Sequence, residues 1–106
     1  MRYLVMVLFF FGASASAATV EVAQKDKQFA KESVELKVGD TLRITNEDDT
    51  VHHIMYKWDG KTTSHKQKKK SDPESKPYEA KFDKAGETMV RCAIHPKMKL
   101  KVVVKK

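Results

Sequence analysis

Residues 92–98, Cys-Ala-Ile-His-Pro-Lys-Met, are the stretch from which the fold and the chemistry of this chain are best inferred. They hold the only cysteine of the protein, one of its four histidines and one of its five methionines. In a tight loop the spacing Cys-x-x-His-x-x-Met would let a thiolate, an imidazole and a thioether converge on one soft metal ion. The spacing alone leaves another interpretation open, in which Cys92 is inert and buried, His95 lies on the surface and Met98 belongs to the core.

A thiolate, imidazoles and a long, weak thioether are the ligands of a mononuclear blue-copper electron-transfer site. Such a site needs a second imidazole from elsewhere in the chain, and His52 and His53 are the adjacent candidates. Neighbouring strand residues point to opposite faces, so the two histidines cannot both be ligands without distortion. The sequence therefore predicts one Cu(I)/Cu(II) ion, and spacing leaves the choice between His52 and His53 open.

Residues 1–18 have the pattern of a secretory signal peptide. Arg2 supplies a positive charge, residues 3–11 form an apolar run too short to span a bilayer, and residues 13–18 are small. Cleavage is expected after Ala17 or Ala18, and a buried N-terminal strand or helix is the alternative. No second apolar run follows. We therefore expect a soluble periplasmic domain at residues 19–106, without a transmembrane segment after cleavage.

The bulk composition limits the partners that such a domain could have. One cysteine cannot form an internal disulfide in an oxidising compartment, and a bound metal would both occupy the thiol and stabilise so small a core. Removing Arg2 lowers the formal charge from +7 to +6. The basic run lacks interleaved aromatic residues, which argues against nucleic acid. A positive surface favours an acidic redox protein partner or an anionic membrane.

Short alternating segments separated by turns predict an all-β sandwich. The expected strands are residues 19–23, 33–38, 41–45, 51–58, 78–82, 88–92 and 100–104. The Gly39-Asp40 turn predicts a hairpin between the second and third of them, with Val34, Leu36 and Val38 facing inward. Residues 24–31 are expected to form a loop whose Phe29 fills the core.

The alternation stops over residues 59–77, which are rich in Lys, Ser, Thr, Gly and Pro. We expect a long Lys-rich loop here, either mobile in solvent or used to dock a partner. His65 within it is interpreted as a surface residue rather than a ligand. Met55 and Met89, on predicted strands, are expected in the core or on a strand surface.

Three features of the sequence are similar to features found together in one known protein family. Residues 38–42, Val-Gly-Asp-Thr-Leu, resemble the start of its hairpin, Asn46 stands six residues before His52, and Gly86 stands six residues before Cys92. With the motif of residues 92–98, the chain resembles the cupredoxins, the blue-copper family of plastocyanin, pseudoazurin and amicyanin. The short spacing between His95 and Met98 is most similar to that of amicyanin. The resemblance implies a Greek-key β-sandwich.

The resemblance implies equatorial copper ligation by His52, Cys92 and His95, with Met98 as the weak axial ligand. His53 stands where the family often has Asn, and Ala93 where it often has Ser or Thr. A side-chain link between the two ligand loops is therefore expected to be missing, and such links orient ligands and tune the metal.

The resemblance also implies that His95 has an exposed edge through which electrons leave. The apolar rim around that edge would be Ile94, Pro96 and Met98. Lys97 and Lys99 flank the rim and would steer an acidic partner toward it.

These expectations describe an exported, monomeric electron carrier that is not an enzyme and whose partner is a cytochrome or dehydrogenase. The leading alternative is a periplasmic copper-binding or copper-delivery protein with the same fold. An enzyme with a Cys92–His95 nucleophile pair is a weaker alternative, because no orienting acid or oxyanion site is evident. A metal-free structural domain is the remaining one.

Overall fold

The computed structural model describes residues 17–106, so the expected signal peptide lies outside it except for Ala17 and Ala18. Within the described residues the chain forms nine β-strands, and no helix there could cross a membrane. The strands are β2 (Thr19–Lys25), β3 (Gln28–Phe29), β4 (Ser33–Lys37), β5 (Thr41–Asn46), β6 (His52–Trp58), β7 (Lys61–Gln67), β8 (Tyr78–Lys81), β9 (Gly86–Cys92) and β10 (His95–Lys105).

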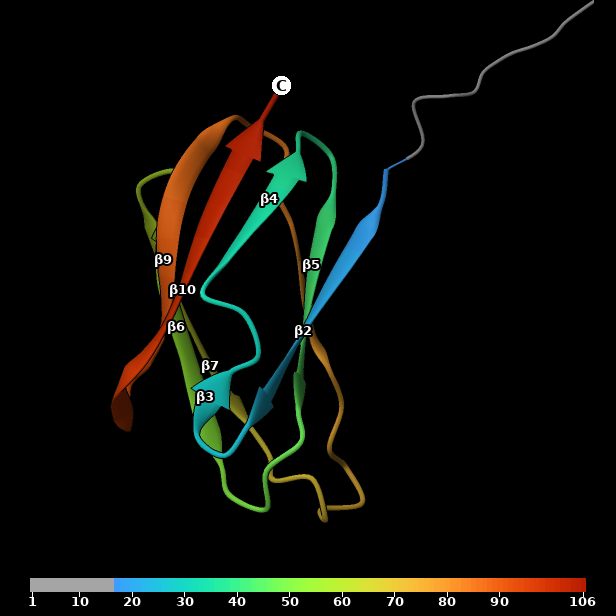
Figure 1. The fold of residues 1–106 in the computed structure, drawn as a ribbon, viewed down its shortest axis with the longest axis vertical. Helices are drawn as coiled ribbons and strands as arrows, with labels where there is room; N and C mark the ends of the chain where they lie inside the picture. The colour runs from blue at the N-terminus through green and yellow to red at the C-terminus, as the bar shows by residue number, and fades with distance from the viewer. Residues whose placement is uncertain (1–16) are drawn as a thin grey trace, which may run out of the picture.

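The strands form two sheets that face each other as a sandwich (Figure 1). One sheet has the order β4-β10-β9-β6-β7 and the other the order β3-β2-β5-β8. β10 with β4 and β2 with β5 are parallel pairs, and the other pairs are antiparallel. The predicted all-β sandwich is confirmed.

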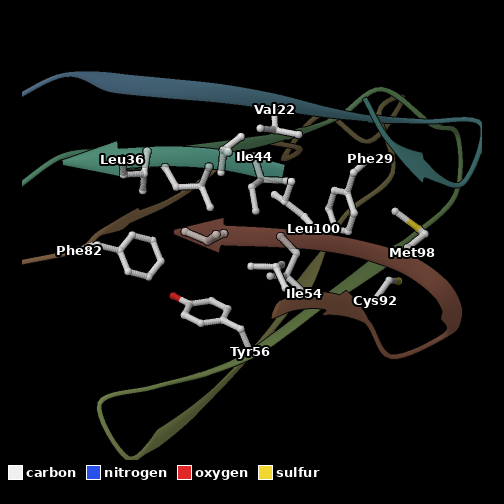
Figure 2. Close-up of a cluster of buried hydrophobic side chains, with 14 of the residues drawn as sticks. Val22, Phe29, Leu36, Ile44, Ile54, Tyr56, Phe82, Cys92, Met98 and Leu100 are labelled. Atoms are coloured by element: carbon white, nitrogen blue, oxygen red, sulfur yellow. The ribbon is translucent and has the colours of Figure 1, made fainter. Parts of the chain in front are cut away.

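The core lies between the sheets and follows from the alternation of buried and exposed residues along the longer strands (Figure 2). On β10, for example, Leu100, Val102 and Val104 are buried, whereas the residues between them are exposed or half-buried. Period-two alternation places one set of side chains on the inner face of a sheet. Phe29 is also buried, as predicted, although it sits on the short strand β3 rather than in a loop.

The predicted hairpin at Gly39-Asp40 is wrong, because β4 and β5 belong to different sheets. Gly39 has a φ of 97°, a conformation that favours glycine. The Asp40 carboxylate accepts hydrogen bonds from the N–H groups of Lys37 and Ala18, both at 2.9 Å, and so binds the turn to the N-terminal segment. The turn carries the chain from one layer to the other, and Val38, expected inside, is 41% exposed.

The predicted long loop at residues 59–77 is also wrong in its first half, which forms β7. This strand pairs with β6 in continuous antiparallel register from Trp58↔Lys61 to His52↔Gln67. Asp59 and Gly60 join the strands with φ of 51° and 77°, and Asp-Gly is a strong signal for such a two-residue hairpin turn. Hydrophobic alternation missed the strand because β7 is a polar edge strand, and lysines are common on sheet edges. Only residues 68–77 form a loop.

Replacing Asp40 by Asn should lower the midpoint of thermal unfolding by a few degrees, because two N–H groups lose a charged acceptor. The hydrogen bonds from Ala18 and Lys37 hold the pKa of Asp40 below its ordinary value of 3.8, against a smaller effect of desolvation. A lowered folded-state pKa stabilises the fold fully above the unfolded-state value, and the stabilisation is lost as the pH falls through the folded-state value.

The difference between the wild type and Asp40→Asn should therefore be largest near neutral pH and shrink below about pH 4. Thermal melts followed by circular dichroism across this range would measure it. The exposed Asp83 on the neighbouring segment is the control, because Asp83→Asn removes a carboxylate that caps nothing in residues 17–106. A wild-type advantage that is the same at pH 7 and about pH 2 would contradict the role given to Asp40.

Candidate metal centre

Three adjacent strands bring the predicted ligand residues to one end of the sandwich. His52 is the first residue of β6, Cys92 the last of β9 and His95 the first of β10. β9 lies between β6 and β10, with Ile54 opposite Cys92, and residues 93–94 form the turn into β10. The cluster is therefore built on paired strands rather than on long loops.

Met98 reaches the core through an irregularity in β10. The β9–β10 register jumps between His95 and Lys99, so that residues 96–98 have no partners on β9. The Met98 side chain is only 2% exposed and lies at the same end of the core as Cys92 (Figure 2). We had expected Met98 to be part of the exposed apolar rim, and this expectation is wrong because the side chain is buried. Ile94, 52% exposed, and Pro96 remain on the surface.

The three donor atoms lie close enough to share one ion. Cys92 Sγ is 3.6 Å from His52 Nδ1 and 3.6 Å from His95 Nδ1, and all three atoms lie within 4.8 Å of one another. Metal–sulfur and metal–nitrogen bonds of about 2.3 and 2.0 Å, as zinc makes them, would separate the donors of a trigonal site by about 3.7 Å. The donor set thus fits a single soft or borderline ion.

The three residues differ in how far they are exposed to solvent. His52 and Cys92 are 0% and 1% exposed, whereas His95 is half-buried. The His52 and His95 rings have their centroids 5.2 Å apart and their planes inclined at 64° to each other. Of the three residues, only His95 has appreciable contact with solvent.

The structure brings His52, and not His53, to the cluster. His53 lies on the opposite face of β6, where its Nε2 contacts the hydroxyl of Ser64 on β7. Its backbone N–H nevertheless points at Cys92 Sγ, 3.3 Å away. His65 is not part of the cluster either, because its ring packs against Tyr78.

Backbone contacts join the two segments that carry the candidate ligands. The N–H of Ala93 donates to the carbonyl of His53 at 2.9 Å, next to the contact from His53 N–H to Cys92 Sγ. The two segments are therefore joined through the backbone, as the expected absence of a side-chain link requires.

Asp48 is the functional residue that sequence reasoning missed. Its Oδ2 lies 2.8 Å from His52 Nε2, and its carboxylate also accepts hydrogen bonds from the N–H groups of Asp26 and Lys27. Desolvation would raise the pKa of Asp48, but the hydrogen bonds from Lys27, His52 and Asp26 outweigh it and lower the pKa. A proton on Nε2, shared with the carboxylate, leaves Nδ1 free to face Cys92. The spacing Asp-x-x-x-His was the available signal.

Asn46 closes the segment that carries Asp48. Its side-chain Nδ2 donates to the carbonyls of Thr50 and Lys68, and its Oδ1 accepts the N–H of Asp48. The spacing of Asn46 and His52 in the sequence thus corresponds to a buried amide that fixes the loop before β6.

Solved structures with the same fold include several copper proteins. Amicyanin from Paracoccus versutus is similar at 24% identity, with a TM-score of 0.70 over 88% of this chain and 85% of that one. The Cu(I) form of an amicyanin variant reaches 25% identity and a TM-score of 0.71, over 87% and 86% of the two chains. A Cu-containing nitrite reductase from Thermus scotoductus is 24% identical with a TM-score of 0.69, over 82% of this chain but 22% of its own.

The sequence itself was compared with families and with curated proteins. No curated protein matches this chain. The family described as "Copper binding proteins, plastocyanin/azurin family" matches residues 16–105. This match spans nearly the whole chain and includes every residue of the candidate metal centre. The protein therefore belongs to the plastocyanin/azurin family of copper-binding proteins.

Proposed function

We propose that this protein is an exported type 1 copper protein that carries single electrons between redox partners. The observation that carries the proposal is the buried group of His52 Nδ1, Cys92 Sγ and His95 Nδ1, which reaches the surface only through His95. A thiolate and two imidazoles with a weak axial thioether suit both oxidation states of copper. In this proposal Met98 is the axial ligand.

The protein's own residues hold the site in shape. His52 is fixed by Asp48 on one ring nitrogen, Cys92 by β9 and the N–H of His53, and His95 by the β9–β10 turn. Bound copper supplies a one-electron Cu(II)/Cu(I) couple. Because strands and hydrogen bonds position the donors, they need little rearrangement when the charge at the site changes by one.

The burial supports a carrier rather than an enzyme. His52 and Cys92 are buried, so a substrate has no open path to the thiolate, whereas the half-buried His95 connects the cluster with solvent. The exposed Ile94 and Pro96 flank His95, and the exposed Lys97 and Lys99 follow in β10. We propose that this rim meets an acidic redox protein, such as a cytochrome or dehydrogenase, and that the carrier is a monomer.

Titration with Cu(II) tests the copper centre directly. The purified protein should develop the intense visible absorption of a thiolate–Cu(II) site at one equivalent, and Cys92→Ser should abolish it. His65→Ala, which removes an imidazole outside the cluster, should leave the spectrum unchanged. Weak, tetragonal copper absorption in the wild type would contradict the type 1 assignment.

Two further measurements separate an electron carrier from a copper-delivery protein. A reversible one-electron couple supports a carrier, whereas rapid loss of copper to a chelator would favour copper delivery.

We also propose that export cleaves the chain after Ala17. In the structure Ala18 N lies 2.9 Å from Asp40 Oδ1, and Ala18 O accepts the N–H of Thr41. Cleavage after Ala17 would place a charged α-ammonium on the Asp40 carboxylate, whereas cleavage after Ala18 would remove both contacts. N-terminal sequencing of the periplasmic protein should therefore begin Ala-Thr-Val. A sequence beginning Thr-Val-Glu would refute this choice of bond.

Asp48 should matter for copper although it is not a proposed ligand. Asp48→Asn removes the charge that orients His52, so Cu(II) should bind about 10- to 100-fold more weakly. The reduction potential should rise, because a less basic imidazole stabilises Cu(II) less. Chelator competition and voltammetry would measure the two effects. Asp49→Asn is the matched control, since this neighbouring exposed carboxylate contacts only Ser71 among the described hydrogen bonds. A lower melting temperature of the metal-free protein with an unchanged potential would show a purely structural role.

A further inference from the structure

The outer face of the five-stranded sheet carries a patch that the proposed copper chemistry does not use. Inward residues of β6, β9 and β10 are buried, so the alternate residues point outward to solvent. We call seven residues of this outward surface the basic sheet face, of which Lys66 lies on the neighbouring strand β7. They are Met55, Lys57, Lys66, Met89, Arg91, Lys99 and Lys101.

The strand register shows that these residues are neighbours. Lys99 on β10 stands opposite Arg91 on β9, and Arg91 stands opposite Met55 on β6. In the next row along the strands, further from Cys92, Lys101 stands opposite Met89. Residues directly opposite on one face of a sheet have their Cβ atoms about 5 Å apart. The cations therefore surround the two methionines rather than being scattered over the molecule.

The charge on this sheet is divided along its length. The outward carboxylates of its strands, Glu35 and Glu87, lie toward the end remote from Cys92. Glu35 forms an ion pair with Lys105, and Glu87 forms one with Lys101 at 3.7 Å. Among residues 17–106, no ion pair involves Lys57, Arg91 or Lys99. The half nearest the metal centre is thus strongly positive and unneutralised.

A shallow groove of about 330 Å³ runs through the centre of this face. Met55 and Met89 line it together with Lys57, Thr62 and Arg91. Both methionines are half-buried. Flexible thioethers adapt to different partners, and methionine and arginine are both enriched at protein interfaces. An apolar groove bordered by cations has the anatomy of a docking site.

We propose that the basic sheet face docks an acidic surface of a partner protein. This rests on the proposed electron-carrier function for its purpose, because Arg91 adjoins Cys92 and a partner seated here would lie beside the Ile94–His95 turn. A second copy of the chain is disfavoured, since two faces of the same sign repel.

A membrane is disfavoured by the position of the exposed apolar residues. Val38 and Ile94 are the large exposed hydrophobic residues of the described chain, and neither lies on this face. Helices that insert into membrane interfaces present Trp, Phe or Leu beside their lysines, whereas here the cations surround only thioethers.

The test is an NMR titration of the ¹⁵N-labelled exported protein with a deca-glutamate peptide at low and high salt. Chemical shift changes should be concentrated at Met55, Met89, Arg91 and Lys99 and should disappear at high salt. The double variant Arg91→Gln/Lys99→Gln should weaken binding roughly tenfold, as the loss of two exposed charge contacts predicts. The double variant Lys76→Gln/Lys81→Gln, with the same loss of charge at the loop before β8 and on β8 of the other sheet, should weaken it much less.

Shifts confined to residues 94–97, or equal weakening by both double variants, would overturn the proposal. Saturable binding to phosphatidylglycerol vesicles without binding to the peptide would also overturn it, in favour of a membrane surface. The copper proposal is tested separately, because the titration can be done with or without the metal. Arg91→Gln/Lys99→Gln should keep the visible spectrum of the wild type, so a change in that spectrum would show a damaged site rather than a lost docking surface.

Discussion

The hydrogen bond between Asp48 and His52 is the interaction on which the proposed copper centre most depends. A buried imidazole needs a partner for each ring nitrogen, and His52 has no access to water. Asp48 occupies Nε2 at 2.8 Å, which leaves Nδ1 facing Cys92 at 3.6 Å. The carboxylate is itself held by the N–H groups of Asp26 and Lys27, whose φ values of 55° and 59° make the β2–β3 turn tight enough to present both donors. A surface turn thus helps to position the buried imidazole of a proposed ligand.

A second polar layer ties the two sheets together beneath His52. Gln67 stands opposite His52 in the β6–β7 ladder, and Gln24 stands opposite Asn46 in the β2–β5 ladder. Gln24 Nε2 donates to Gln67 Oε1, while Gln67 Nε2 donates to the carbonyl of Ile44. Buried amides that bond across the sandwich fix the distance and register of the layers more specifically than apolar contacts do. β7 therefore supports the site, although its sequence looks like that of a solvated loop.

Features that are decided within one short segment could be predicted from the sequence. Examples are the Cys92, His95 and Met98 motif and the alternation of the core strands, because neither depends on which strand pairs with which. The resemblance to cupredoxins selected His52, and the structure brings that residue to the cluster. The failures were non-local: Gly39-Asp40 is a turn signal, but pairing with other strands decides whether a turn makes a hairpin or changes sheets. Asp48 was missed because its role depends on the β2–β3 turn, more than twenty residues earlier.

Alternation along β9 and β10 gives this strand pair one inward face and one outward face with different contents. Along β9 and β10 the inward residues fill the core and lead to Cys92, while the outward residues carry Arg91 and Lys99. The turn between the strands then ends in His95, the proposed exit for the electron. In the two proposals, cations on the outer sheet face would attract and orient an acidic partner without contacting the proposed ligands, because Arg91 and Cys92 point to opposite faces. Docking and copper binding would therefore respond to different substitutions, although the residues responsible are adjacent in the sequence.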